Sequence, residues 1–279
     1  MNLSASALLW LAEGRPAVVV EVAEHRGSVP REAGTRMLVA AQEVLGTIGG
    51  GHLELRAITD ARRLLRGEAV ATEQHIALGP ALGQCCGGAL TLRLQPLADS
   101  RPAQWALPEP RFTLQLFGAG HVGRAIVRLL EGIPCRVQWI DEREDQFPAA
   151  PSAAHIERVC VEPVEAEVSQ APPGAFVLVL THSHDLDLAI TQAVLKRGDF
   201  GWLGLIGSQT KRQRFLRRFE QRGIAPELLA RLNCPIGLPG ITGKEPEVIA
   251  VAVVAQLLAL GYSPSANLRS ATRSSTCTV

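Results

Sequence analysis

A glycine-rich turn in the second half of the chain narrows the possible folds more than any other part of the sequence. Gly118, Gly120 and Gly123 form a G-x-G-x-x-G pattern that follows an apolar run and opens a helical pattern reaching Leu130. In such a strand–turn–helix unit the first glycine permits a tight turn and the second lets a pyrophosphate approach the backbone. The third lets helix and strand pack closely. The helix N-terminus then offers unpaired amides to an anion.

The rest of this half alternates between short apolar runs and helical patterns. Strands are predicted at 112–117, 135–140, 176–180 and 202–206, and helices at 186–197, 210–222 and 248–260. Alternation of this kind predicts an α/β fold with a parallel sheet and helices on both faces. Together with the glycine pattern it predicts a Rossmann-type domain over residues 112–264.

The first part of the chain has a different pattern. Strand-like runs at 17–23, 36–39, 71–78 and 89–97 surround one helical pattern that ends near Gly67, which predicts a smaller α+β domain over residues 1–98. Prolines at 102, 108 and 110 indicate a linker over 99–111. Residues 265–279 are rich in Ser, Thr and Arg and are predicted to form a flexible tail.

Composition excludes several classes of protein. A net charge of +1 gives no general field for nucleic acid, and the longest apolar stretch, 248–260, is shorter than the roughly 20 residues that cross a bilayer. The six cysteines show no spacing typical of a secreted disulfide framework. These features predict a cytoplasmic protein that partners neither nucleic acid nor membrane.

The predicted Rossmann domain leaves its ligand open. Asp141 ends the second predicted strand, where a carboxylate can accept hydrogen bonds from the ribose hydroxyls of an adenosine. Arg143 lies two residues on and could instead favour a phosphate there. NAD(P), another adenine nucleotide and a different ligand in a reassigned pocket are all compatible with this pattern.

Three further loops follow predicted strands, where open parallel sheets bind ligands. His182 and His184 are interpreted as pocket-lining side chains beside a helix cap at Ser183 or Asp185, and no bound metal is predicted. Ser208 is expected to cap a basic helix whose first turn carries Lys211; this helix is either a solvated face or an anion-binding surface. Lys244 lies in a glycine-rich loop that could hold a phosphate or be a structural turn.

Two loops of the first domain also suggest ligand chemistry. Cys85 and Cys86 lie between glycines, and their thiolates could face a soft metal or take part in sulfur transfer; burial as inert core residues is the alternative. The triple glycine at 49–51, directly before a helix, is a second anion-friendly loop.

Taken together, these motifs resemble the XdhC/CoxI family of xanthine dehydrogenase accessory proteins. The resemblance rests on residues 27–31, 46–54, 83–88, 181–185, 204–212 and 235–246, and it covers nearly the whole chain. It implies an N-terminal XdhC/CoxI domain, a C-terminal Rossmann domain and a dimer.

The resemblance also implies a function. A protein of this family is expected to bind molybdenum cofactor (molybdopterin), protect it while a cysteine desulfurase replaces an oxo ligand by sulfur, and insert it into the molybdenum-binding subunit of xanthine dehydrogenase. Cys85 and Cys86 are then expected near the molybdenum. The remaining cofactor-binding candidates are Gly118, Gly120, Gly123, Asp141, His182, His184, Ser208, Lys211 and Lys244.

An enzyme is the competing hypothesis. An NAD(P)-dependent oxidoreductase could use the Rossmann domain and a proton donor such as His182 or His184. The sequence carries no recognisable substrate-domain signature for it, and the paired cysteines have no role in it. We therefore favour a non-catalytic binding and insertion protein.

Overall fold

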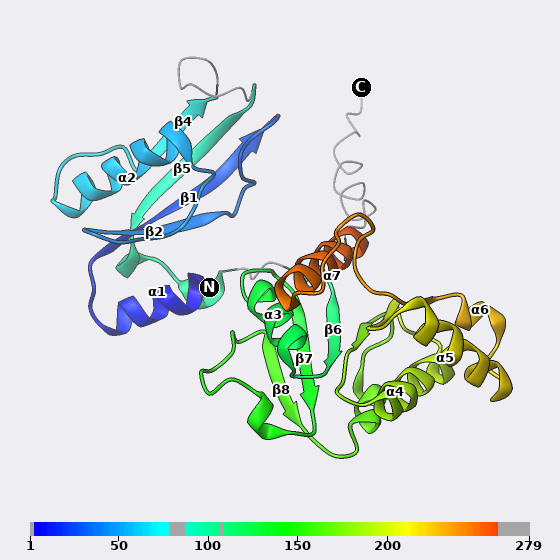
Figure 1. Cartoon of the computed structure of the whole chain (residues 1–279). Coiled ribbons are helices and arrows are strands. Elements are labelled where there is room, and N and C mark those ends of the chain that lie inside the picture. The colour runs from blue at the N-terminus through cyan, green and yellow to red at the C-terminus, as the bar shows by residue number, and fades with distance from the viewer. Residues whose placement is uncertain (1–2, 79–86, 106–108, 262–279) are drawn as a thin grey trace, which may run out of the picture. The chain divides into compact units, whose positions relative to one another are not determined.

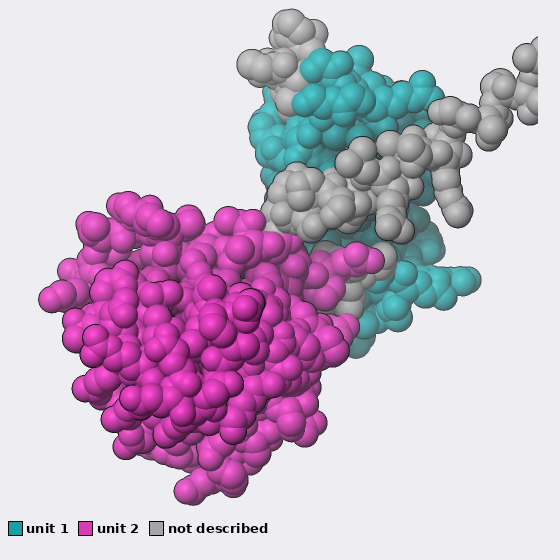
Figure 2. Space-filling view, turned by 90° about the vertical axis from the view of Figure 1, so that its right-hand side faces the viewer, with its two compact units in different colours: residues 1–107 teal, residues 108–279 magenta. Residues whose placement is uncertain are grey.

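The chain forms two compact units, and each has its own hydrophobic core. The computed structural model describes residues 3–78, 87–105 and 109–261 (Figure 1). The units are Met1–Leu107 and Pro108–Val279, drawn in two colours in Figure 2. None of the described helices is long and apolar enough to cross a membrane.

Unit 1 is an antiparallel sheet with one helix on each face. The sheet has the strand order β3-β2-β1-β5-β4. Its strands are β1 (Ala17–Arg26), β2 (Arg36–Ala40), β3 (Val44–Gly46), β4 (Glu73–Ala77) and β5 (Ala89–Pro96), and the helices are α1 (Leu3–Ala12) and α2 (Gly51–Leu65). Short 3-10 turns at Leu97–Asp99 and Pro102–Gln104 end the unit.

Alternating side chains along β1 divide the core of unit 1 into two layers. Val18 and Val20 pack in the cluster that contains Ala57 and Ala61 of α2. Val19 belongs to the opposite cluster, together with Trp10 of α1. Because successive side chains of a strand point to opposite faces, one valine-rich strand can serve both helices.

Unit 2 is a parallel sheet with the strand order β11-β10-β9-β6-β7-β8. Its strands are β6 (Thr113–Phe117), β7 (Arg136–Asp141), β8 (Ile156–Cys160), β9 (Phe176–Val179), β10 (Trp202–Leu205) and β11 (Leu232–Asn233). Its helices are α3 (His121–Leu130), α4 (His184–Arg197), α5 (Gln209–Gln221), α6 (Pro226–Leu229) and α7 (Pro246–Gly261), with 3-10 turns at Glu144–Gln146 and Val164–Gln170.

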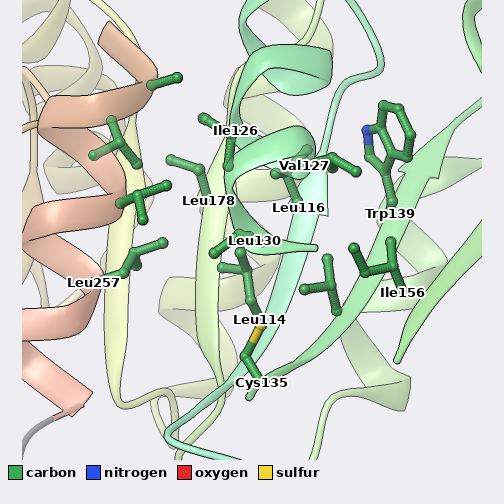
Figure 3. Close-up of a cluster of buried hydrophobic side chains, with 14 of the residues drawn as sticks. Leu114, Leu116, Ile126, Val127, Leu130, Cys135, Trp139, Ile156, Leu178 and Leu257 are labelled. Atoms are coloured by element: carbon green, nitrogen blue, oxygen red, sulfur yellow. The ribbon is translucent and has the colours of Figure 1, made fainter. Parts of the chain in front are cut away.

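Helices cover both faces of this sheet, which confirms the predicted α/β class. One cluster joins Leu114 and Leu116 of β6 to α3 and to Leu257 of α7, and Figure 3 shows these side chains together with Trp139 and Leu178. The other cluster joins Phe117 to side chains of α4 and α5. Burial of these two apolar layers is the main force that holds the sheet between its helices.

The register of the sheet brings the carboxyl ends of its central strands to one level. Phe117 is paired with Ile140 on one side and with Val179 on the other, and Val179 is paired with Leu205. The chain runs outward from β6 through β7 to β8 and then returns to place β9 on the other side of β6. The gap between β6 and β9 is therefore the topological switch point, where open α/β sheets bind ligands.

Three strands of the sheets, β3, β8 and the two-residue strand β11, are absent from the sequence expectation. β8 is an edge strand with polar, partly exposed residues such as Glu157 and Arg158, so it contains no apolar run. β3 contains only three residues and pairs with β2 across a tight turn. β3, β8 and β11 are held in the sheets by pairing with a neighbouring strand, and their own residues form no strand pattern.

Candidate functional site

The loops after β6, β7 and β9 enclose a small pocket at the switch point. Its lining includes Gly118, Asp141, Glu142, Thr181 and His182. The imidazole Nε2 of His182 lies 3.6 Å from a carboxylate oxygen of Glu142, which links the ends of β9 and β7. This pocket is called the crevice below.

The three glycines of the turn are required for different reasons. Gly118 has φ = 123°, and a Cβ there would collide with the carbonyl group of Leu180. A Cβ on Gly123 would collide with the carbonyl oxygen of Gly118. Gly120 differs, because its φ of −69° suits any residue and a Cβ there would meet nothing within 4 Å. Neither backbone strain nor packing requires glycine at position 120, whereas close approach of a ligand would.

Asp141 braces the glycine-rich turn. Its Oδ2 accepts hydrogen bonds from the Ala119 amide at 2.7 Å and from Nη2 of Arg143 at 2.9 Å. Its Oδ1 accepts from the backbone amide of Arg143 at 3.0 Å and from Nε of Arg143 at 2.9 Å. A carboxylate has about four lone-pair positions, and these four donors use all of them.

The environment of Asp141 favours its charged form. Burial alone would raise the pKa of this carboxyl, but hydrogen bonds from the Arg143 side chain and from the amides of Ala119 and Arg143 hold it below its ordinary value. The same ion pair raises the pKa of Arg143. Asp141 is therefore an ionised residue whose acceptor positions are filled by protein donors.

A larger cavity lies next to the crevice, where β9 and β10 end. Its volume is about 340 Å³, and its walls are Thr181, His182, Ser183, His184, Asp187, Ile206, Gly207, Ser208 and Lys211. The lining comes from the two loops that follow β9 and β10 and from the first turns of α4 and α5. We call this space the β9–β10 cavity.

A buried ion pair forms one wall of the β9–β10 cavity. Nζ of Lys211 lies 2.5 Å from Oδ2 of Asp187, with side chains 11% and 2% exposed. The other oxygen of Asp187 accepts hydrogen bonds from the backbone amide and the hydroxyl of Thr181, at 3.0 and 2.8 Å. Lys211 also donates to the carbonyl oxygen of Ile206 at 2.9 Å. One carboxylate thus joins the ends of β9 and β10 to the start of α5.

Serine side chains cap the two helices at the cavity, as the sequence predicts. Oγ of Ser183 accepts from the amides of Asp185 and Leu186, and Oγ of Ser208 accepts from the amide of Lys211. The N-cap position of α3 is Gly120, which has no side chain to do the same. The first turn of α3 therefore keeps amides for another acceptor.

Sequence comparison assigns both units. Residues 114–257 match the XdhC Rossmann domain, and residues 10–75 match the XdhC and CoxI family. The chain belongs to the XdhC and CoxI family.

Two known proteins are similar to this chain over most of its length. The Escherichia coli (strain K12) protein YqeB is 31% identical over 270 residues, which is 92% of this chain. This chain spans only 46% of YqeB, so it corresponds to less than half of that relative. The crystal structure titled as a xanthine dehydrogenase from Bacillus halodurans is 20% identical, with a TM-score of 0.68 over 99% of this chain and 98% of that one. At this identity the likeness shows a common fold.

The structure brings most of the predicted XdhC site residues of unit 2 to one edge of the sheet. Gly118 and Asp141 line the crevice, and His182 lines both the crevice and the cavity. His184, Ser208 and Lys211 line the cavity. Gly120 and Gly123 belong to the turn beside them. Lys244 is exposed in the loop before α7 and lines neither space.

The paired cysteines of the XdhC/CoxI unit, Cys85 and Cys86, lie outside the described residues. The residues directly after them are placed: a Cβ on Gly88 would collide with the carbonyl oxygen of Ser28. A Cβ on Gly49 would in turn collide with the ring of Pro30. The family motifs at 27–31 and 46–54 and the end of the motif at 83–88 therefore lie together at one end of the unit 1 sheet.

An acid of the protein itself occupies part of the triple-glycine loop, which the sequence indicates as anion-friendly. A carboxylate oxygen of Glu54 accepts hydrogen bonds from the Thr47 hydroxyl at 2.5 Å and from the amides of Ile48 and Gly50 at 3.0 and 3.1 Å. Burial would raise the pKa of Glu54, but these hydrogen bonds hold it below its ordinary value. An acid from the first turn of α2 thus occupies the amides of Ile48 and Gly50, whereas the N-cap Gly50 gives the helix no side-chain cap.

Sequence reasoning missed the residue that organises the β9–β10 cavity. Asp187 lies inside a helical pattern and two residues after the predicted loop, where its residue type alone does not distinguish it from an exposed helix acid. The spacing of Asp187 could have been a signal, because it lies on the same face of the helix as the buried Ile190 and Val194. Among the described residues, no group of three or more His, Cys, Asp and Glu side chains is arranged to hold a metal ion.

Proposed function

We propose that this protein is a xanthine dehydrogenase accessory factor that binds molybdenum cofactor, protects it during sulfuration and delivers it to the molybdenum-binding subunit of the enzyme. Membership of the XdhC and CoxI family supports the accessory role. The observation that carries the binding role is the pair of adjoining spaces at the carboxyl edge of the Rossmann sheet, which share Thr181 and His182.

The residues present fit such a cofactor. Gly120 leaves open space where a Cβ would be, and the first turn of α3 has no side-chain cap, so a polar ligand can approach the backbone there. Lys211, Ser208, His182 and His184 offer side-chain hydrogen bonds around the cavity. When bound, the cofactor supplies the molybdenum centre and its sulfur ligand. In this proposal the protein's own residues bind, orient and shield it, without turnover.

An NAD(P)-dependent oxidoreductase receives less support from the same site. Such an enzyme uses the acid at the end of the second strand to read the adenosine ribose. In this chain Asp141 already accepts four hydrogen bonds from Ala119 and Arg143. Its acceptor capacity is used by the protein, which favours a ligand without a ribose diol at that position.

Retention of the cofactor tests the binding role. The protein is expressed in cells with intact molybdenum-cofactor synthesis, and bound molybdenum is measured by mass spectrometry and pterin by fluorescence after acid oxidation. We expect both to co-purify with the wild-type chain and to fall in Gly120→Val, which fills the open space beside the turn. Gly132→Val is the matched control, because Gly132 also has no neighbour within 4 Å of a Cβ but follows the C-terminal end of α3. Wild-type protein that carries NAD and no pterin would contradict the proposal.

Assembly of the target enzyme tests the delivery role. We expect xanthine dehydrogenase from a strain that lacks this protein to contain little sulfurated cofactor and to regain it when the wild-type gene is returned. Enzyme that acquires its full complement of active cofactor without this protein would defeat the delivery role. In the proposed sequence a cysteine desulfurase supplies the sulfur while a cytoplasmic dimer of this protein holds the cofactor.

The paired thiols give a separate test of how the cofactor is held. We propose that Cys85 and Cys86 face the sulfur-bearing side of the cofactor, because thiolates suit a soft metal centre. The double substitution Cys85→Ser with Cys86→Ser should then lower the molybdenum content while leaving the fold unchanged by circular dichroism. If the variant retains as much molybdenum as the wild type, both cysteines have a structural role and do not hold the cofactor.

A further inference from the structure

We propose that the β9–β10 cavity is the phosphate subsite of this protein and that it takes a phosphomonoester with Lys211 as the reading residue. This inference rests on the proposed function in one respect: the pterin cofactor is the expected carrier of that phosphate. This places the phosphate at the ends of β9 and β10. In dinucleotide-binding Rossmann domains the phosphates lie instead at the turn after the first strand.

Lys211 has one hydrogen-bond position left for a ligand. An ammonium group carries three N–H donors. Two of them are directed to Oδ2 of Asp187 and to the carbonyl oxygen of Ile206, at 2.5 and 2.9 Å. Nζ also lies 5.4 Å from the centroid of the Phe215 ring. Lys211 lines the cavity, and we infer that its third donor can serve an acceptor inside it.

Lys211 is stabilised by its ion pair with Asp187, although its place at the start of a helix is unfavourable for a positive charge. Lys211 is the third residue of α5, where the helix dipole opposes a positive charge, and its side chain is 11% exposed. A Cβ on Gly207 would meet Cδ of Lys211, so the lysine stem lies directly over Gly207. Taking two charges out of water is costly and packing alone would favour apolar side chains, which makes a buried ion pair in a cavity wall a candidate for function.

Asp187 holds the lysine without repelling an anion in the cavity. Three donors surround its carboxylate, namely the amide and hydroxyl of Thr181 and the ammonium of Lys211. These donors offset the negative charge of Asp187. Asp187 is therefore a positioning residue, and Lys211 is the group that would contact the phosphate.

The other walls of the cavity suit a phosphate as well. The first turns of α4 and α5 both border it, and the positive ends of their dipoles lie on that side. Ser208 and His184 add side-chain donors to the lining. Arg212 follows Lys211 in α5 and contributes further positive charge. A volume of about 340 Å³ leaves room for a phosphate and the adjoining part of its carrier.

The opposite end of the site repels phosphate. The end of β7 and the turn after it carry Asp141, Glu142, Glu144 and Asp145, and Arg143, the cation between them, is paired with Asp141. The amide of Ala119 in the glycine-rich turn already donates to Asp141. In the cavity wall, Asp187 is paired with Lys211, and Asp185 lies nearby in the first turn of α4. Because the end of β7 carries more unpaired acids, we expect an anion to prefer the β9–β10 cavity.

Binding of inorganic phosphate to the full-length protein tests the subsite. Phosphate is titrated by isothermal calorimetry at constant ionic strength into the wild type, Lys211→Met and Arg217→Met. Arg217 is an exposed residue of the same helix, so its substitution removes the same charge away from the cavity. We expect Lys211→Met to weaken phosphate binding by about tenfold, the loss of one charge-assisted hydrogen bond, and Arg217→Met to leave it unchanged.

Two further variants keep the test decisive if Lys211→Met fails to fold. Removing the lysine alone leaves Asp187 buried without its cation, whereas the double substitution Asp187→Asn with Lys211→Met removes both charges together. His184→Ala changes an exposed lining residue with little effect on folding. Weaker phosphate binding is expected in both. Equal binding by the wild type and these folded variants, or an equal loss in Arg217→Met, would overturn the subsite.

The carrier of the phosphate is distinguished by two measurements. AMP titration tests whether a nucleotide binds in the cavity. The content of co-purified pterin tests whether the cofactor binds there. We expect the pterin content to fall in Lys211→Met and added phosphate to displace pterin from the wild type. Pterin that co-purifies equally with wild type and variant would reject the subsite and leave the proposed function standing. Lysine-dependent binding of phosphate and AMP without any pterin would support the subsite and reject the proposed function.

Discussion

Two carboxylates, Asp141 and Glu54, show how an acid beside a glycine-rich loop can serve the fold. Each lies beside a glycine-rich loop, and each accepts hydrogen bonds from amides of that loop. An ionised side chain that fills these acceptor positions fixes the shape of the loop and removes the amides from competition for an external anion. Individual glycines of these loops are not equivalent: a Cβ on Gly49 would collide with Pro30, whereas a Cβ on Gly50 or Gly120 would meet nothing within 4 Å.

Asp141→Asn should make unit 2 less stable, and the loss should depend on pH. The pKa of Asp141 in the folded protein lies below its ordinary value of about 3.9, so its contribution is present above that pH and is lost as the pH falls through the folded pKa. We expect the variant to lose about 1–3 kcal/mol of unfolding free energy at neutral pH. The difference from the wild type should shrink as the pH falls below about 4.

Urea unfolding at a series of pH values measures this difference. Asp145→Asn is the control, because that neighbouring carboxylate is exposed and should change little. If the difference in unfolding free energy between the wild type and Asp141→Asn stays constant down to the lowest pH, the ionised carboxylate does not have this structural role.

At the scale of elements, helix starts determine how the carboxyl edge of the sheet is used. Serines cap α4 and α5 and thereby fix the first turns that border the cavity. The start of α3 has glycine at the equivalent position. The capped starts of α4 and α5 therefore border the cavity at the carboxyl edge of the sheet. The uncapped start of α3 lies beside it and leaves backbone amides that a ligand can approach.

Ser183→Ala should destabilise unit 2 by about 1 kcal/mol, the typical effect of losing a helix N-cap. The physical reason is that the amides of Asp185 and Leu186 lose their acceptor at the start of α4. Thermal unfolding followed by circular dichroism measures the change. Ser183→Asn keeps a capping oxygen and is expected to retain most of the stability, so a loss equal to that of alanine would argue against the cap.

At the scale of the whole molecule, the two units have separate hydrophobic cores, and each contains two of the four tryptophans. Unit 1 contains Trp10 and Trp105, and unit 2 contains Trp139 and Trp202. The clusters around α1 and α2 involve residues of unit 1, and those around the parallel sheet involve residues of unit 2. Each unit is large enough to bury a core of its own.

A fragment of residues 109–261 should therefore fold without unit 1. We expect a cooperative thermal transition and the far-ultraviolet circular dichroism of an α/β domain, because both faces of its sheet are covered by its own helices. Phosphate titration of this fragment would show whether the β9–β10 cavity functions within one unit. A fragment that aggregates or unfolds without cooperativity would show that unit 2 depends on unit 1.

Much of the fold and part of the site could be predicted because the signals are local. The spacing of Gly118, Gly120 and Gly123 indicates a strand–turn–helix unit, and serines before helical patterns indicate caps. The carboxyl ends of parallel strands meet at one edge, so the positions of His182, Ser208 and Lys211 after predicted strands are enough to group them. Lys244 shares the glycine-rich character of these loops but lines neither space.

Residue types at short spacing are enough to predict the α/β class, the family and the loops that carry polar side chains. Which of those side chains are free to bind depends on contacts made in the folded chain. Asp141 is saturated by donors that include an amide 22 residues away in the chain, and Lys211 pairs with Asp187 across 24 residues. Hydrogen-bond capacity is consumed by neighbours in space, and no local pattern in the chain records which neighbours those are.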